Sequence, residues 1–140
     1  MGGRWEARPH NDSVRSFQRK LKQLTKRSWS MSFRERIKRL NWVIRGWINY
    51  FRIGKMKGHM QRIDGRLRTR LRIIAWKQWK TSRKRFQALV MLGIPEWMAR
   101  QSTGFGNHYQ AVAKTAGLRK ISKEIFSRMG LVSCLDYYLR

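Results

Sequence analysis

The sequence has 140 residues, and its 41% hydrophobic content, including seven Trp, is enough to bury the core of one domain, which excludes a disordered basic tail. Its 33 Lys and Arg oppose only seven Asp and Glu, which leaves a formal net charge of +26. A charge of this size predicts a polyanionic partner rather than a small-molecule substrate, with RNA, DNA and an anionic membrane surface as the candidates.

The apolar segments are too short for a membrane protein. No apolar run approaches the roughly 18 to 20 residues that a helix needs to cross a bilayer. The first twelve residues lack the apolar core of a secretory signal. We therefore expect a protein without a membrane partner, located in the bacterial cytoplasm or, in a eukaryote, in an organelle matrix.

The predicted elements begin with a flexible lead-in over residues 1–12, followed by one domain over residues 13–140. A first helix is predicted over residues 13–28, where apolar side chains recur every three or four positions. Ser32 and Glu35 have the spacing of a capping box, so a second helix should begin there, with Glu35 reaching back to Ser32. The apolar positions of the first helix are Val14, Phe17, Leu21 and Leu24.

The second helix has one apolar face and one basic face. At about 100° per residue, seven apolar side chains fall on one arc, and four cations fall on another arc beside it. The apolar positions are Phe33, Ile37, Leu40, Ile44, Trp47, Ile48 and Phe51, and the basic positions are Arg34, Lys38, Arg45 and Arg52.

A third helix, predicted over residues 56–79, has an apolar stripe flanked by cations on both sides. Ile73 and Trp76 point away from this stripe, which indicates either a second packing neighbour or a stacking surface. The stripe consists of Met60, Ile63, Leu67, Leu71 and Ile74, with Arg68 and Arg72 on one flank and Arg62, Arg66, Arg70 and Lys77 on the other.

The remaining elements are short. A helix over residues 83–92 should end at Gly93, and Pro95 suits the first turn of the next helix. A glycine-rich loop over residues 104–109 precedes two small helices, over residues 122–129 and 133–139. The sequence predicts an all-α fold, a small helical bundle with short C-terminal helices.

Catalytic and metal-binding patterns are lacking. Asp12, Asp64 and Asp136 are isolated from other acids, and the three His have no metal-ligand spacing. The single Cys134 has no evident base beside it and excludes an internal disulfide. We therefore expect no catalytic residue, no metal and no cofactor.

Positive charge is concentrated in the middle of the chain. Residues 56–90 carry eleven bases and one acid, whereas residues 91–140 carry a net charge of only +4. A solvated helix face usually mixes both signs, so this excess favours contact with a nucleic acid. For five tryptophans core packing is the default expectation and base stacking the alternative; these are Trp42, Trp47, Trp76, Trp79 and Trp97.

Residues 40–52 (LNWVIRGWINYFR) closely resemble a signature of the maturase domain of group II intron-encoded proteins, also called domain X. Trp42 stands where that family commonly has Pro. The resemblance continues in order over residues 13–140, through LRTRLR at 67–72, WKQWK at 76–80, GNHYQA at 106–111 and GLVSCLDYY at 130–138.

The resemblance implies a thumb-like helical domain that binds group II intron RNA and assists its folding and splicing. In the family this domain follows a reverse transcriptase palm, but the Tyr-x-Asp-Asp polymerase motif is absent here, so we expect no enzyme activity from this chain alone. Trp47, Leu67, Leu71 and Ile74 are the expected scaffold. The predicted RNA contacts are Arg45, Arg52, Lys55, Lys57, Arg68, Arg72, Lys77 and Lys80.

Two other functions remain open from the sequence. The chain could be the thumb fragment of a split or degraded group II intron reverse transcriptase, with a separate palm chain as its partner. It could also be a structural RNA-binding protein of another kind, in which case the ordered Trp and Arg positions would be coincidence. Charge alone does not distinguish RNA from DNA as the ligand.

Overall fold

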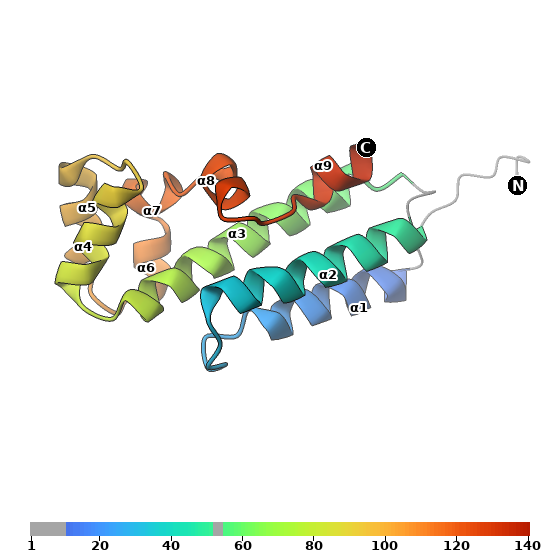
Figure 1. Cartoon of the computed structure of the whole chain (residues 1–140), viewed down its shortest axis with the longest axis horizontal. Helices are drawn as coiled ribbons and strands as arrows, with labels where there is room; N and C mark the ends of the chain where they lie inside the picture. Colours follow the sequence, from blue (N-terminus) through green and yellow to red (C-terminus); the bar gives the residue numbers. More distant parts are fainter. Residues whose placement is uncertain (1–10, 52–54) are drawn as a thin grey trace, which may run out of the picture.

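The computed structural model describes residues 11–51 and 55–140, and over these residues the chain forms α-helices and no strands, as predicted. Figure 1 shows a long central helix with the other helices packed along and beyond it. The helices are α1 (Asn11–Leu24), α2 (Phe33–Phe51), α3 (Lys57–Trp79), α4 (Ser82–Met91), α5 (Glu96–Thr103), α6 (Tyr109–Ala113), α7 (Ala116–Arg119), α8 (Lys123–Arg128) and α9 (Cys134–Leu139).

Helix α3 organises the bundle. Helices α1 and α2 lie together along one side of it, α9 lies along its N-terminal half, and α4 to α7 gather at its C-terminal end (Figure 1). The core forms where the predicted apolar stripes of α1, α2 and α3 meet, and it includes Phe17, Leu40 and Leu71, all fully buried. The expected scaffold residues Leu67, Leu71 and Ile74 are buried in this core.

The N-terminal helix boundaries differ slightly from the predicted ones. Helix α1 begins at Asn11, so the described part of the expected lead-in is already helical, while residues 1–10 lie outside the described residues. Ser32 caps α2 by accepting a hydrogen bond from the Glu35 amide at 3.1 Å. The Glu35 carboxylate pairs with Arg39 at 3.2 Å instead of reaching back to Ser32, so half of the predicted capping box forms.

The C-terminal segments contain two short helices, α6 and α7, that the sequence pattern did not predict. Gly117 in α7 lies against α5, because a Cβ atom at this position would approach Met98 O to 2.9 Å and Ser102 Oγ to 2.5 Å. Gly93, with φ of +91°, ends the α4 segment in the left-handed conformation predicted for it. Close backbone contact rather than helical periodicity therefore places α7.

The tryptophans divide into buried and exposed ones. Trp76 is fully buried, and its Nε1 donates to Gly106 O at 2.7 Å, so the second packing neighbour of α3 is the 104–109 loop. Trp47 is partly buried and stacks on Phe17 with ring centroids 4.6 Å apart. The prediction of core packing is wrong for Trp42 and Trp97, which are 81% and 63% exposed, because both lie on helix faces turned away from the core.

Candidate nucleic-acid interface

The C-terminal end of α1 and the loop after it carry backbone carbonyl groups that the helix does not pair, and the Arg36 side chain binds several of them. Arg36 is 1% exposed and donates to Leu24 O, to Trp29 O at 2.7 Å and to Lys26 O at 3.4 Å. Burial lowers the pKa of Arg36 below its ordinary value, yet an arginine remains protonated at neutral pH. The cation thus faces the negative end of the α1 dipole.

Side chains from α3 bind the same segment. Arg70 donates through Nε to Thr25 Oγ1 at 2.7 Å and through Nη2 to Lys22 O at 3.1 Å. Lys77 Nζ donates to Arg27 O at 3.1 Å. Burial, followed by the charge of Arg27, lowers the pKa of Arg70. These bonds hold α1 at a defined position beside α3.

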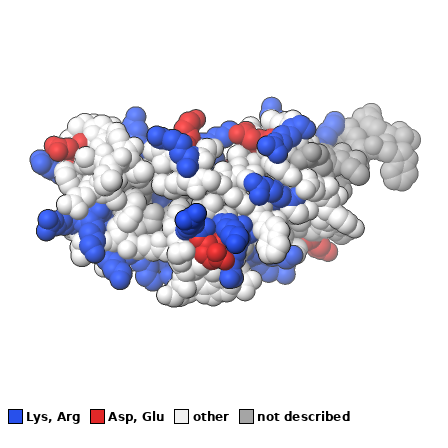
Figure 2. Space-filling view, viewed as in Figure 1, with Lys and Arg blue, Asp and Glu red and all other residues white. Residues whose placement is uncertain are grey.

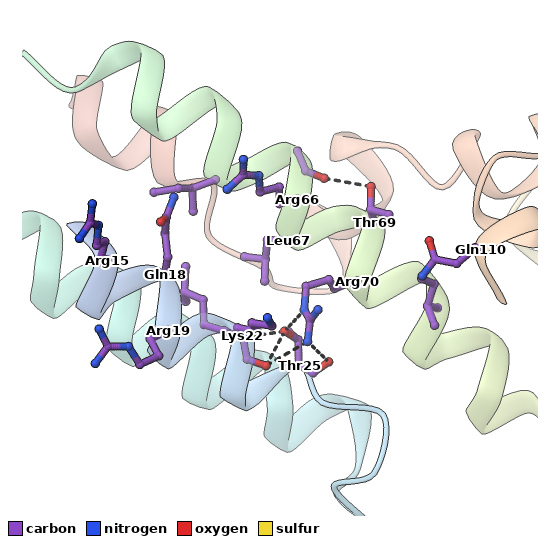
Figure 3. A pocket seen from close by; sticks show the side chains of 14 residues that line it. Arg15, Gln18, Arg19, Lys22, Thr25, Arg66, Leu67, Thr69, Arg70 and Gln110 are labelled. Carbon is purple, nitrogen blue, oxygen red and sulfur yellow. Dashed lines mark hydrogen bonds between the residues drawn. The ribbon is translucent and has the colours of Figure 1, made fainter. Parts of the chain in front are cut away.

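A groove of about 810 Å³ lies between α1 and α3. Apolar side chains, including Leu21, Ile63 and Leu67, line its inner surface. Figure 3 shows the basic side chains of α1 on one rim and those of α3 on the other. The cations of this groove are Arg15, Arg19 and Lys22 from α1 and Arg66 and Arg70 from α3.

Two further hollows continue this groove along the α1–α2 connection. The hollow of about 570 Å³ shares Thr25, Arg70 and Gln110 with the groove. The hollow of about 430 Å³ shares Arg27 and Lys77 with the 570 Å³ hollow. We call the whole the basic groove, with the exposed or partly exposed cations Arg15, Arg19, Lys22, Lys26, Arg27, Arg66, Arg70, Lys77 and Lys80.

The basic groove has the electrostatics of a phosphate-binding surface. No Asp or Glu is among the described residues that line any of its three parts. Cations at fixed positions on helices attract a polyanion without competition from neighbouring carboxylates. On the face drawn in Figure 2, by contrast, acidic side chains lie among the basic ones.

The description of the matching family is "Group II intron, maturase-specific domain", and its model matches residues 14–90, more than half of the chain. The chain belongs to this family. The matched residues include most of the residues that line the basic groove. The resemblance of residues 106–111 and 130–138 to the family lies outside the matched range. A search among curated proteins found no match.

Only two of the eight predicted contact residues of this maturase-specific domain line the basic groove. Lys77 and Lys80 do so, near the C-terminal end of α3. Arg68 and Arg72 lie on the opposite flank of α3, where Arg72 donates to Ile121 O at 2.9 Å. Burial, then the charges of Arg68 and Arg119, lower the pKa of Arg72.

The other four predicted contact residues lie elsewhere. Arg45 is exposed on α2, and Lys55 and Lys57 are exposed around the start of α3. Arg52 lies outside the described residues. The structure therefore does not bring the predicted set together on one surface.

The α1 rim of the groove was not predicted from the sequence. Residues 13–30 carry six bases and no acid, which was the available signal. The helical pattern of residues 56–79 predicts Arg66, Arg70 and Lys77 on one flank of α3. No sequence pattern near these residues indicates that α1 lies along that flank. The contact between α1 and α3 decides which flank forms a groove.

The acidic, histidine and cysteine side chains of the described residues do not form a metal-binding cluster. No group of three His, Cys, Asp or Glu side chains among them could hold a metal ion. Cys134 is buried, and burial, followed by the charge of Asp64, raises the pKa of its thiol, which keeps the thiol protonated. Within residues 11–51 and 55–140, no helix is both long and apolar enough to span a bilayer.

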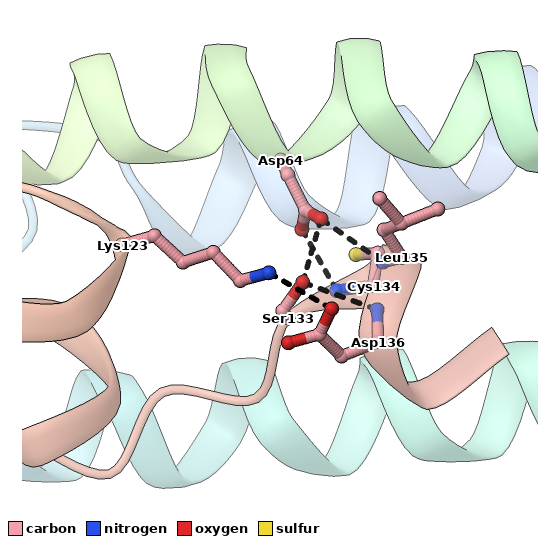
Figure 4. Close-up of polar contacts among 6 residues, drawn as sticks. All are labelled: Asp64, Lys123, Ser133, Cys134, Leu135 and Asp136. Carbon is pink, nitrogen blue, oxygen red and sulfur yellow. Dashed lines mark hydrogen bonds and ion pairs between the residues drawn. The ribbon is translucent and has the colours of Figure 1, made fainter. Parts of the chain in front are cut away.

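Asp64, isolated in the sequence, anchors α9 to α3. Its side chain is buried and accepts hydrogen bonds from Ser133 Oγ at 2.9 Å, Cys134 N at 2.8 Å and Leu135 N at 2.9 Å (Figure 4). These backbone amides open α9 and have no partners within the helix. The Asp64 carboxylate therefore has a structural role at the start of α9.

Arg70→Gln should reduce the free energy of unfolding by about 1 to 2 kcal/mol, because it removes charged hydrogen bonds to the end of α1. Urea denaturation followed by circular dichroism would measure this change. Arg66→Gln is the matched control on the same rim, and its exposed side chain should alter stability by less than about 0.5 kcal/mol. Equal losses in both variants would contradict the role assigned to Arg70.

Asp64→Ala should reduce the free energy of unfolding by about 3 kcal/mol, because the buried amide of Cys134 and the partly buried amide of Leu135 lose their acceptor. Thermal and urea denaturation would both report this loss. Asp136→Ala removes an exposed carboxylate paired with Lys123 at 2.8 Å, and it should cost less than about 1 kcal/mol. A similar cost for the two variants would show that Asp64 does not anchor α9.

Proposed function

We propose that this maturase-specific domain binds group II intron RNA along the basic groove and thereby assists folding and splicing of the intron. The observation that carries the proposal is the row of cations, without a lining acid among the described residues, within the region that matches the family. The domain contributes no catalytic group in this role, and the splicing chemistry belongs to the RNA.

The physics of RNA folding supports this function. Compact RNA brings phosphates close together, and their repulsion must be neutralised. Arg15 and Arg19 lie one helical turn apart on α1, and they line the groove together with Arg66 and Arg70 of α3 (Figure 3). Guanidinium groups on rigid helices favour paired hydrogen bonds to phosphate oxygens, so they stabilise the folded RNA at a small entropic cost.

The proposed contact set combines groove residues with some of those predicted from the sequence. Lys77 and Lys80 belong to both groups, and Arg45 and Lys57 are exposed outside the basic groove. Arg52 and Lys55 also stay in the proposed set. Arg68 and Arg72 have a packing role in this proposal, because they face α8 and the segment before it.

The test is equilibrium binding of the purified chain to a structured group II intron RNA and to a DNA duplex of matched charge, across a salt series. Tighter binding of the intron RNA above about 150 mM salt, where non-specific phosphate contacts weaken steeply, would support the proposal. Equal loss of both ligands with the same salt slope would contradict it, because the chain would then act as a non-specific polycation.

Arg15→Gln combined with Arg19→Gln should weaken intron RNA binding and reduce the slope of log K against log salt by about 2, because two phosphate contacts are lost. Lys120→Gln combined with Arg128→Gln removes the same charge outside the basic groove and should change the slope much less. Filter binding at several salt concentrations measures both. An equal effect of the two double variants would reject the groove as the binding surface.

A further inference from the structure

The outer face of α2 presents a tryptophan to solvent. Trp42 is 81% exposed, and in the helical repeat it lies opposite Leu40, Ile44 and Ile48, which are fully buried in the core. Among the described residues, no ring and no cation stacks on its indole. Its position on α2 is therefore not explained by packing.

Exposed cations surround Trp42 on the same face. Lys38 precedes it by one helical turn and Arg45 follows by three residues, so both lie beside the indole, and Arg34 lies one turn farther along. The acid in this helix, Glu35, lies two turns before Trp42 on this face, and Arg39 pairs with it at 3.2 Å. None of these cations lines the basic groove, so the face is a separate positive surface.

A comparison with Trp97 shows what is particular to Trp42. Trp97 is also exposed, but it follows Glu96 at the start of α5. The cation one turn away from it, Arg100, lies 5.7 Å from the Phe86 ring. Single exposed apolar side chains are common on proteins. An exposed indole between cations of one helix face is a different arrangement, and it matches the chemistry of a nucleotide.

We propose that this face of α2 binds an unpaired RNA nucleotide, with the base stacked on Trp42 and the flanking phosphates contacted by Lys38 and Arg45. The inference rests on the proposed function only for the identity of the ligand as RNA. Bases within a duplex have their faces covered by neighbouring pairs, so stacking on a side chain selects unpaired nucleotides. Every base has a π-face, so the site selects single-stranded loops without reading their sequence.

Two RNAs of equal phosphate number test the proposal: a hairpin with a long single-stranded loop and a fully paired duplex. Trp42→Ala should weaken hairpin binding at least about fivefold, which corresponds to the lower end of measured base–aromatic stacking. It should leave duplex binding unchanged. Trp42→Phe should retain most of the hairpin affinity, because the smaller ring still stacks.

Salt dependence separates stacking from charge. Trp42→Ala should leave the salt slope for the hairpin unchanged, whereas Lys38→Gln combined with Arg45→Gln should reduce it by about 2. Trp97→Ala is the matched control and should change neither affinity nor slope. Circular dichroism of each variant should match the wild type, since the replaced side chains are exposed.

The outcomes distinguish this inference from the proposed function. If Trp42→Ala binds the hairpin as tightly as the wild type does, or loses hairpin and duplex equally, the stacking site is wrong while binding through the basic groove can still hold. If the wild-type chain does not prefer intron RNA over DNA, the proposed function is wrong. A loss of hairpin affinity in Trp42→Ala, with duplex affinity unchanged, would in that case still establish a site for single-stranded nucleotides.

Discussion

The arrangement of this domain depends on how the carbonyl groups at the end of α1 find hydrogen-bond donors. A helix end and the loop after it leave carbonyls that cannot be buried unpaired. Arg36 from α2 and Arg70 from α3 donate to them, so one cluster of bonds joins the first three helices. The same bonds hold α1 along α3 and thereby form the basic groove between them.

A chain with so few acids must hold its buried cations without carboxylate partners. Arg36 and Arg85 are both buried, and backbone carbonyls accept their hydrogen bonds; Arg85 Nε, for example, donates to Trp76 O at 2.8 Å. Asp64 does the reverse, since it is a buried anion that accepts from backbone amides of α9. Helix ends thus neutralise the buried charges, and most of the remaining cations stay on the surface, available to a polyanion.

The two basic surfaces have complementary physical properties. The basic groove combines cations on two rims with an apolar inner surface, which suits a backbone that lies along it. The outer face of α2 carries one exposed indole between cations. Binding of phosphates by one surface and of an unpaired base by the other would let a small domain distinguish a folded RNA with loops from a plain duplex.

The sequence by itself determined the helices that carry a strong local signal: the apolar stripes of α1 to α3, the Ser32 cap and the Gly93 stop all follow from periodicity and backbone preference within a few residues. Its long ordered motifs also indicated the family. Only the tertiary structure decided that Arg72 packs against Ile121 O, that Trp42 is exposed, and that α1 completes the groove beside Arg66. Those outcomes depend on which helix faces meet. Hydrophobic periodicity shows the apolar face of one helix, but it does not show which distant segment packs against that helix.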